Sequence, residues 1–579
     1  MRSHCKLFIL LLLSSTKAGT TQASGGAVIP VQAPHAMVAS VHRLASRAGV
    51  QMMKAGGNAV DAAVAVGFAL AVVHPQAGNL GGGGFMLVRL ADGKTHFVDY
   101  REKAPAAARA NMYLDAQGNV IEDASIVGYK AIGVPGSVAG MVYAEKKYGR
   151  LSLERVTAPA IKLAEEGFAL AAEDARDLRE DKPLGQFPES RRIFQQDGNF
   201  YKTGDVFKQP DLARTLKRIA SNPDDFYHGA MAQELAVAMR KGGGLITTED
   251  LAHYEVKERE AVRGTYRGYE IISAPPPSSG GVTLIETLNI LEGYDLAKLG
   301  GRSSPATHLT VEAFRRAFYD RAEFLGDPDF SKIPVAQLID KRYGAAWRES
   351  IDPAHASVSK GLRRPAIFSQ LEQYATLHAE PVAVAEPDHT THYSVVDPDG
   401  NAVAVTTTLN DSFGSRVTAE GLGFLLNDEM DDFAAKQGVP NMFGLIQGPA
   451  NAIGPGKRPL SAMAPTIVLK DGKLFLVLGS PGGPRIITTV ANILMGVVDY
   501  GMNIQEAVNA PRFHHQWLPD VVSVEQGFSP ATVKVLERVG HEVKPEDSWS
   551  DGECIMIDPR TGDRLGASDK RNNGKAVGF

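Results

Sequence analysis

Two adjacent threonines, Thr390 and Thr391, begin a strand-like run directly after a polar, proline-containing segment. A threonine at the start of a strand is usually only a β-branched residue in a favourable place. Its hydroxyl becomes a useful nucleophile when a base adjoins it, and one such base is the α-amino group of the same residue. That amine has a reference pKa of about 7.7–8.0, but it exists only if the chain is cut before the threonine. The hypothesis is therefore a cut between His389 and Thr390.

The segment before this run is the least regular part of the sequence. Residues 353 to about 389 contain several prolines and little hydrophobic periodicity. Such a segment is typical of a linker, a flexible loop or a processing site. Its composition alone favours a linker, and only the residues that follow favour processing.

The sequence lacks the motifs of several common kinds of catalytic and nucleotide-binding site. The sequence has no His-Glu-x-x-His, Cys-x-x-Cys, P-loop or Gly-x-Ser-x-Gly pattern. The glycine-rich run "GNLGGGGF" at 78–85 follows a helix and leads into a strand, which is the reverse of a dinucleotide site. His514 and His515 have no acidic or cysteine partner at ligand spacing, so we expect packed histidines and no metal site.

Three predicted hairpins supply the strands that would position these residues. They span 85–100, 392–405 and 466–480, and each turns at an Asp-Gly pair. Their strands are almost continuously apolar, which is typical of sheets covered on both faces. Ala-rich helices are predicted at 41–57, ending at two glycines, and at 58–73, capped by Asn58. We therefore expect an α+β fold with a layered helix–sheet–sheet–helix body, and a mostly helical region over 140–350.

Composition places the chain among ordinary globular proteins. It has 579 residues, 44% hydrophobic and 22% charged, with a formal net charge of -5. No run of Lys and Arg could neutralise several phosphates, so we expect no nucleic-acid partner.

The N-terminus has the parts of a secretory signal peptide over residues 1–23. Arg2 and Lys6 precede an apolar run from Leu7 to Leu13, and small residues follow. The run is far shorter than the ~20 residues of a membrane span. We expect a periplasmic or extracellular protein with no membrane attachment after signal removal. Only Cys554 would then remain, so no intrachain disulfide could form.

Eight collinear motifs make a specific resemblance. From about residue 34 to the C-terminus the chain contains "GNLGGGGFMLVR", "DYREKAPA", "PPPSSGG", "TTHYSVVD", "LNDEMDDF", "GPGKRPLSAMAPTIV", "GSPGGPRIITT" and "APRFHHQW". In this it resembles the bacterial secreted γ-glutamyltranspeptidases, which are N-terminal nucleophile hydrolases with a four-layer αββα fold. The resemblance implies a precursor that cuts itself into a large subunit, 24–389, and a small subunit, 390–579, which stay together as a heterodimer.

The resemblance also implies roles for the candidate catalytic residues. Thr390 would be the nucleophile both for self-cleavage after His389 and for attack on a γ-glutamyl amide. Thr408 would hydrogen-bond its hydroxyl. Gly482 and Gly483 would donate backbone N–H groups to the oxyanion.

The remaining implied residues would recognise the glutamyl group. Arg101 would bind the α-carboxylate with its forked donors, and Ser461 would assist. Asn410, Glu429 and Asp432 would receive the α-ammonium. No metal or organic cofactor is implied.

Three positions depart from the pattern common in bacterial members. Ala462 stands where a second serine is usual, Glu429 where some members have a glutamine, and Phe443 where many have a lid tyrosine. Phe443 could cover the pocket by packing but not by a hydrogen bond. We therefore expect altered lid closure, and more hydrolysis relative to transfer.

The implied activity is that of a self-processing γ-glutamyltransferase and hydrolase. It would act on glutathione and related γ-glutamyl amides, and transfer the γ-glutamyl group to water or to amino-acid or dipeptide acceptors. One alternative is an acylase of the same fold that processes cephalosporin (glutaryl) or poly-γ-glutamate substrates. A glutaryl acylase has no amine to bind, so Asp432 and Glu429 would then have no purpose. The other alternative is a secreted binding protein without catalysis.

Overall fold

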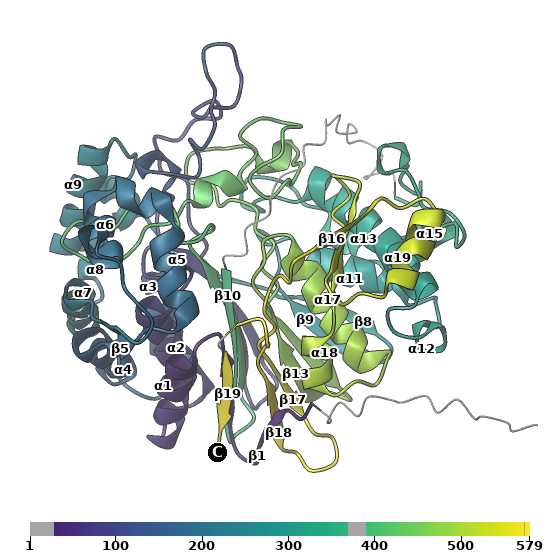
Figure 1. Ribbon diagram of the computed structural model, residues 1–579, viewed down its shortest axis with the longest axis horizontal. Coiled ribbons are helices and arrows are strands. Elements are labelled where there is room, and N and C mark those ends of the chain that lie inside the picture. Colours follow the sequence, from purple (N-terminus) through teal and green to yellow (C-terminus); the bar gives the residue numbers. More distant parts are fainter. Residues whose placement is uncertain (1–27, 369–389, 573) are drawn as a thin grey trace, which may run out of the picture.

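The computed structural model describes residues 28–368, 390–572 and 574–579, which form two stacked sheets between two groups of helices (Figure 1). The expected signal peptide at 1–23, the start of the expected large subunit at 24–27, and His389 lie outside the described residues. The same holds for the part of the expected processing segment from 369 to 389.

Each of the two large sheets has seven described strands, and all neighbouring strands for which a register is given pair antiparallel. The first sheet has the order β19 (Lys575–Gly578), β2 (Met37–Ser40), β10 (Thr390–Val396), β11 (Ala402–Thr408), β3 (Gly83–Arg89), β4 (Thr95–Asp99) and β7 (Lys257–Arg259). The second sheet has the order β1 (Val31–Ala33), β18 (Arg564–Ala567), β17 (Cys554–Ile557), β13 (Lys473–Leu478), β12 (Thr466–Lys470), β9 (Tyr269–Ser273) and β8 (Val262–Tyr266). Smaller sheets contain β5 (Phe168–Ala169) and β6 (Val206–Phe207), and β14 (Phe513–His514), β15 (Val522–Glu525) and β16 (Val543–Glu546).

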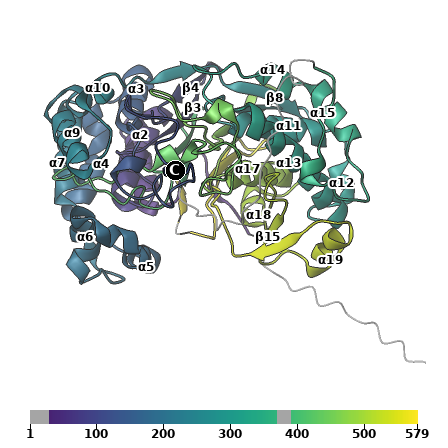
Figure 2. The ribbon, with the colours of Figure 1, turned by 90° about the horizontal axis from the view of Figure 1, so that it is seen from above.

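Helices cover the outer face of each sheet, as Figure 2 shows from above. Beside the first sheet lie α1 (Arg43–Lys54), α2 (Ala59–Val73), α3 (Ser137–Tyr148), α4 (Leu153–Glu166), α5 (Ala172–Glu180), α6 (Pro188–Gln195), α7 (Pro210–Ser221), α8 (Asp225–His228), α9 (Ala230–Gly242) and α10 (Thr248–Ala252). Beside the second lie α11 (Gly280–Leu291), α12 (Leu296–Leu299), α13 (Ser304–Phe324), α14 (Val335–Leu338), α15 (Lys341–Glu349), α17 (Arg485–Val498), α18 (Ile504–Asn509) and α19 (Pro530–Arg538). The expected four-layer αββα architecture is confirmed.

The layers follow from alternation along the buried strands. Successive side chains of a strand point to opposite faces of its sheet. In β3, Phe85 and Leu87 share a core with second-sheet residues such as Leu476, whereas Met86 and Val88 share a core with α2. Every residue of β3, β10 and β11 is buried, which is why their sequences read as apolar runs.

All three predicted Asp-Gly hairpins are present, as β3–β4, β10–β11 and β12–β13. The two predicted helices are α1 and α2. Asn58 caps α2 as expected, since its side chain accepts hydrogen bonds from the N–H groups of Val60 and Asp61. The reciprocal bond runs from the Asn58 N–H to the Asp61 carboxylate at 2.7 Å, which completes a capping box.

The region 140–350 is mostly helical, as expected, but it also contains strands that the sequence did not indicate. β8 and β9 form a hairpin on the second sheet, and β7 lies at the edge of the first. The β8–β9 turn places Arg267 and Gly268 at φ 53° and 81°. An Arg-Gly pair is a weaker turn signal than Asp-Gly, because arginine seldom adopts positive φ.

Each of the two large sheets combines strands from before position 390 with strands from position 390 onward. In the first sheet, β10, β11 and β19 follow position 390 in the chain, and the other four strands precede it. In the second, β12, β13, β17 and β18 follow it, and β1, β8 and β9 precede it. The two halves of the sequence therefore build one body.

The described beginning of the expected flexible segment is anchored. The Ala356 N–H donates to the Val539 carbonyl at 2.8 Å, and the Ser359 N–H donates to the Asp520 carboxylate at 2.8 Å. Arg364 forms buried ion pairs with Asp320 on α13 at 2.5 Å. The sequence of residues 353–368 shows no regular helix or strand pattern because isolated contacts hold this segment to the body of the protein. These residues are therefore not the loose linker that the sequence led us to expect.

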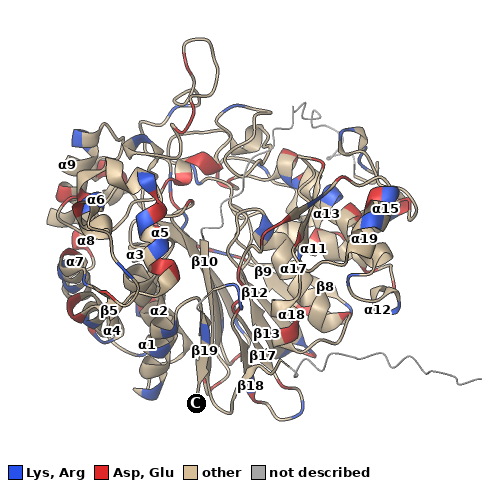
Figure 3. Ribbon diagram, viewed as in Figure 1, with Lys and Arg blue, Asp and Glu red and all other residues tan. Residues whose placement is uncertain are grey.

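Charges of both signs are interspersed over the outer helices (Figure 3). Cys554 is buried, and burial raises the pKa of its thiol. Within the described ranges, no helix is both long and apolar enough to cross a bilayer.

A buried histidine lies between the two sheets. His392 on β10 is fully buried, and its Nδ1 lies 2.9 Å from the Thr406 hydroxyl. Its Nε2 lies 3.1 Å from the Ser394 hydroxyl, which itself donates to the Glu553 carbonyl. Nε2 therefore carries the proton and Nδ1 accepts. Burial lowers the pKa of His392 to about 3.

This histidine predicts acid sensitivity. Its unfolded form binds a proton below about pH 6.5, but its folded form does so only near pH 3, so stability is complete above pH 6.5 and is lost as the pH falls. The loss reaches about 1.4 kcal/mol per pH unit for this group. His392→Gln should therefore show a smaller fall in Tm between pH 7 and pH 5 than the wild-type protein. His253→Gln changes an exposed histidine and is the control; equal falls in all three proteins would refute the prediction.

Candidate active site

The two expected hydroxyls lie opposite each other at the open end of the β10–β11 pair. Thr390 is the first residue of β10 and pairs in register with Thr408, the last residue of β11. The Thr390 Oγ1 donates a hydrogen bond to the Thr408 Oγ1 at 3.1 Å. The Thr408 hydroxyl also accepts the Asn410 N–H at 2.9 Å. Both side chains are buried, so the pair is fixed within the first sheet.

The glycine-rich run at 78–85 makes room for these residues. A Cβ on Gly82 would clash with the Thr408 carbonyl oxygen, and a Cβ on Gly83 would clash with the Glu102 carboxylate. The run therefore has a structural purpose that the sequence did not reveal: it lets β3 approach β11 and the loop after β4. Asn410 has φ 83° and donates through Nδ2 to the Asp428 carbonyl at 3.2 Å.

Gly482 and Gly483 lie between β13 and the first turn of α17. Their φ values are 122° and 50°, which favours glycine at both positions. Their carbonyls accept the N–H groups of Arg485 and Ile486. No described residue accepts a hydrogen bond from either glycine N–H. The positive end of the α17 dipole lies beside these free donors.

Arg101 follows β4 and is completely buried among carboxylates. Its Nη1 pairs with Glu429 and its Nη2 with Asp432, both from the short 3-10 helix η5 (Glu429–Asp432). The Glu102 carboxylate lies 3.6 Å from Nη1, and Nε donates to the Pro459 carbonyl at 3.2 Å.

Three carboxyl groups around one guanidinium compete for charge. Burial raises the pKa of Glu102 to about 7 and the pKa of Glu429 well above its ordinary value. Burial also raises the pKa of Asp432, against the opposing effect of Arg101. Like charges this close cannot all ionise, so the group shares protons near neutral pH. Glu429 Oε2 and both Glu102 side-chain oxygens are buried and receive no hydrogen bond from any residue that the structure describes.

One small cavity, of about 20 Å³, brings most of the predicted residues together. The predicted residues on its wall are Arg101, Thr390, Thr408, Asn410, Glu429, Asp432, Phe443, Ser461 and Gly483. Gly482 is next to this wall but not part of it, and His389 is outside the described residues. The space is far smaller than an amino acid, so a substrate could enter only if the residues around it moved.

Ser461 and Phe443 line the small cavity from two loops. The Ser461 hydroxyl accepts the Met463 N–H at 3.0 Å, and Ala462 adjoins it on the wall. Phe443 is buried, and a Cβ on Gly483 would touch its ring. Its carbonyl accepts the Gln516 Nε2–H at 3.0 Å. Phe443 thus forms part of the cavity wall.

Arg321, on α13, is a cavity residue that the sequence did not indicate. It lies in "FRRAFYDRAEF", where charges at helical spacing read as a solvated face. Instead, α13 is buried over nearly its whole length. No local signal separates Arg321 from the neighbouring arginines.

Comparison with known proteins decides the family. The sequence profile described as gamma-glutamyltranspeptidase matches residues 45–579. This chain belongs to the gamma-glutamyltranspeptidase family.

Similar family members span nearly the whole chain. A glutathione hydrolase proenzyme of Escherichia coli (strain K12) is 50% identical over 546 residues, covering 94% of this chain and 91% of its own. A glutathione hydrolase proenzyme of Pseudomonas sp. (strain A14) is 49% identical over 568 residues, or 95% of each chain. A solved cephalosporin acylase from Bacillus halodurans is 27% identical with a TM-score of 0.82, covering 98% of this chain and 99% of its own.

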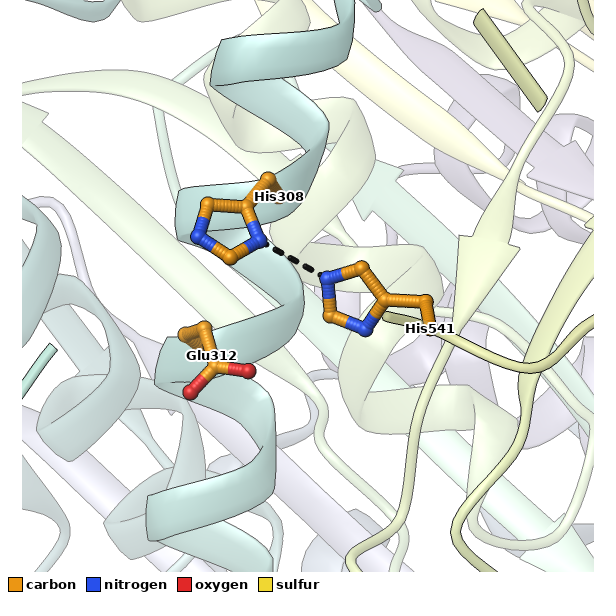
Figure 4. A group of neighbouring side chains, drawn as sticks. All are labelled: His308, Glu312 and His541. Atoms are coloured by element: carbon orange, nitrogen blue, oxygen red, sulfur yellow. Dashed lines mark hydrogen bonds between the residues drawn. The ribbon is translucent and has the colours of Figure 1, made fainter. Parts of the chain in front are cut away.

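A second polar cluster lies apart from the small cavity. His308 and Glu312 on α13 face His541, and the three could geometrically hold a metal ion (Figure 4). The His308 Nδ1 lies 2.8 Å from the His541 Nε2, and the His308 Nε2 lies 2.9 Å from the Asp352 carbonyl. A carbonyl can only accept, so His308 donates its Nε2–H to Asp352. Its Nδ1 then accepts a hydrogen bond from the Nε2–H of His541.

Neighbouring arginines make this cluster a poor cation site. Glu312 forms ion pairs with Arg315 and Arg316, at 3.2 and 2.6 Å. Arg315 also lies 3.4 Å from His541 Nδ1, and burial together with Arg315 lowers the pKa of His541 to about 3. The cluster is a hydrogen-bonded relay anchoring Asp352. His514 and His515 are likewise hydrogen-bonded, to Thr488 and Gln516 and to Asp520, as expected for packed histidines.

The relay predicts insensitivity to metal chelation. Because the carboxylate and both imidazoles already have partners, dialysis against EDTA should leave Tm within about 1 °C, and added Zn²⁺ should not raise it. A fall in Tm that one metal ion restores would contradict this assignment. His541→Ala should lower Tm in the presence and absence of EDTA alike.

Proposed function

We propose that this protein is a self-processing γ-glutamyltransferase and hydrolase that acts on glutathione and related γ-glutamyl amides. The observation that supports it best is one small cavity whose wall holds the Thr390–Thr408 hydroxyl pair beside Arg101, Glu429 and Asp432. The E. coli and Pseudomonas relatives are named glutathione hydrolase proenzymes, which agrees with both the substrate and the processing.

The charges suit an amino-acid zwitterion. In the empty site the Arg101 guanidinium is paired with the carboxyl groups of Glu429 and Asp432. A glutamyl α-carboxylate would take over the Arg101 fork, and the α-ammonium would take over the released carboxylates. Glu429 Oε2, which is buried and accepts no hydrogen bond from the described part of the chain, would supply an acceptor for that ammonium.

In the proposed processing step, Thr390 Oγ1 attacks the carbonyl carbon of His389. The peptide C–N bond breaks and the nitrogen of Thr390 is released as an amine, leaving an ester that water cleaves. Thr408 would orient the attacking hydroxyl across its 3.1 Å hydrogen bond. The large subunit 24–389 and the small subunit 390–579 would then share both sheets, which would hold them together without a covalent bond.

In the proposed reaction, the freed amine of Thr390 takes the hydroxyl proton as Oγ1 attacks the γ-carbonyl. The developing oxyanion receives the N–H groups of Gly482 and Gly483, each donor contributing about 3–4 kcal/mol. The amide nitrogen leaves with the proton, and a γ-glutamyl ester remains on Thr390. Water or an acceptor amine then attacks this ester, and Thr390 Oγ1 regains its proton.

A wider cavity, of about 510 Å³, also reaches Thr390. Its wall includes Gln76 and Arg176 from the sequence before position 390, and Ser412 and Asn572 after it. Because the small cavity has no room for a second molecule, the wide cavity would be where the leaving amine departs and the amino-acid or dipeptide acceptor enters.

Incubation at neutral pH followed by intact-mass measurement and N-terminal sequencing tests the processing. We expect two chains, the smaller beginning Thr390-Thr391-His392. Thr390→Ala should remain one chain, because it lacks the hydroxyl, and Thr408→Ala should be cut more slowly. A wild-type protein that stays one chain and turns over no γ-glutamyl amide would refute the proposed function and favour a binding protein.

The acylase alternative is tested at Asp432. In the processed enzyme, Asp432→Asn should lower kcat/KM for γ-glutamyl-p-nitroanilide by about 10²-fold, because a buried charge loses its partner. Glutaryl-p-nitroanilide has no α-ammonium, so kcat/KM for this donor should fall less than about threefold in Asp432→Asn. Asp399→Asn, in an exposed turn, is the control. A similar loss on both donors, or none, would favour the glutaryl acylase.

A further inference from the structure

A second buried arginine faces the small cavity with an unused donor. Arg321 is 2% exposed and lines the cavity from α13. Its Nε donates to the Ser279 hydroxyl at 2.9 Å. Its Nη1 is buried and has no hydrogen-bond partner in the described chain. An unpaired buried donor is costly, so it points to a partner that arrives in another state of the site.

The charge that Arg321 faces is Asp432. Burial lowers the pKa of Arg321 to about 10, and the carboxylate of Asp432 opposes that effect. Arg321 therefore stays a cation at neutral pH. The charged groups that surround Asp432 are Arg101 and Glu102 after β4, Glu429 and Asp431 on η5, and Arg321 on α13.

We infer that Arg321 is a positioning residue that takes over Asp432 when the substrate's α-carboxylate occupies Arg101. In the empty site Asp432 bonds to Arg101 Nη2. Substrate binding, as proposed above, removes that bond and leaves Asp432 to hold an ammonium. The unused Nη1–H of Arg321 then bonds to one Asp432 oxygen and keeps the residue an oriented anion, while the other oxygen receives the ammonium.

The same arginine is fixed to the loop that carries Ser461. The Ser279 hydroxyl, which accepts the Arg321 Nε–H, donates to the Ser461 carbonyl at 2.6 Å. The Ser279 N–H donates to the same carbonyl at 2.7 Å. Arg321 is thus held in place through Nε, which leaves Nη1 available for the partner exchange.

The test measures two donors that differ only in the α-amino group. Arg321→Gln should raise KM for γ-glutamyl-p-nitroanilide by about 10- to 100-fold, the effect of losing a hydrogen bond to a charged group. Its kcat should change less than about threefold, and glutaryl-p-nitroanilide should be affected less than about threefold in both constants. Arg321→Lys keeps the charge but not the forked donor. Its KM for γ-glutamyl-p-nitroanilide should therefore lie between the values of Arg321→Gln and the wild-type enzyme.

The pH profile adds a readout that a structural role would not move. A nearby cation favours the ionised form of Asp432, so removing it raises the pKa of this carboxyl. The acid limb of kcat/KM for the γ-glutamyl donor should therefore move to higher pH in Arg321→Gln. In an Asp432→Asn background the Arg321 substitution should add little further loss, because both act through one contact.

Arg316→Gln is the matched control, since Arg316 lies on the same helix and is 1% exposed but pairs with Glu312. Equal losses on both donors in Arg321→Gln, or an unmoved acid limb, would overturn the inference. If Arg321→Gln stays uncut, the comparison is made with Arg321→Lys, for which an unselective loss is equally decisive. Wild-type inactivity on γ-glutamyl-p-nitroanilide would instead refute the proposed function.

Discussion

The antiparallel register of β10 with β11 determines the geometry of the site, because it sets the Thr390 hydroxyl opposite that of Thr408. β2 and β3 flank this pair, and its faces are covered by α2 and by the second sheet. A slip of one residue would turn every buried side chain to the wrong face, so the register is strongly specified. The loops that carry Arg101, η5 and the glycine pair meet around this strand end, where their residues line one cavity with Thr390 and Thr408.

Charge compensation is the second organising constraint. A buried guanidinium such as that of Arg101 is tolerated only with paired, hydrogen-bonded carboxylates. Among the described residues, two buried atoms near this pair have no hydrogen-bond partner: Glu429 Oε2, an acceptor, and Arg321 Nη1, a donor. A ligand carrying one positive and one negative group can therefore enter without adding net charge. The stability of the empty site and the selectivity of the occupied one depend on the same residues.

Much of this was readable in the sequence, since hairpins and caps are encoded by local chemistry. Asp-Gly turns and Asn58 predicted the central strands and α2, and the family resemblance predicted nine of the fifteen residues on the cavity wall. The β8–β9 hairpin was missed because Arg267-Gly268 is an unusual turn. Arg321 was missed because its burial depends on how α13 packs against the second sheet. The purpose of the glycines at 82 and 83 emerges only when β11 and Glu102 are seen against them.

The interleaving of strands from before and after position 390 has a thermodynamic consequence. While the chain is continuous, refolding is a unimolecular process, independent of concentration. Once it is cut before Thr390, unfolding releases two molecules, and their reunion obeys mass action. Neither fragment retains a complete sheet to serve as a template, because each sheet draws strands from both. The cut form would persist through a slow rate of opening, and its lifetime would be set by a kinetic barrier.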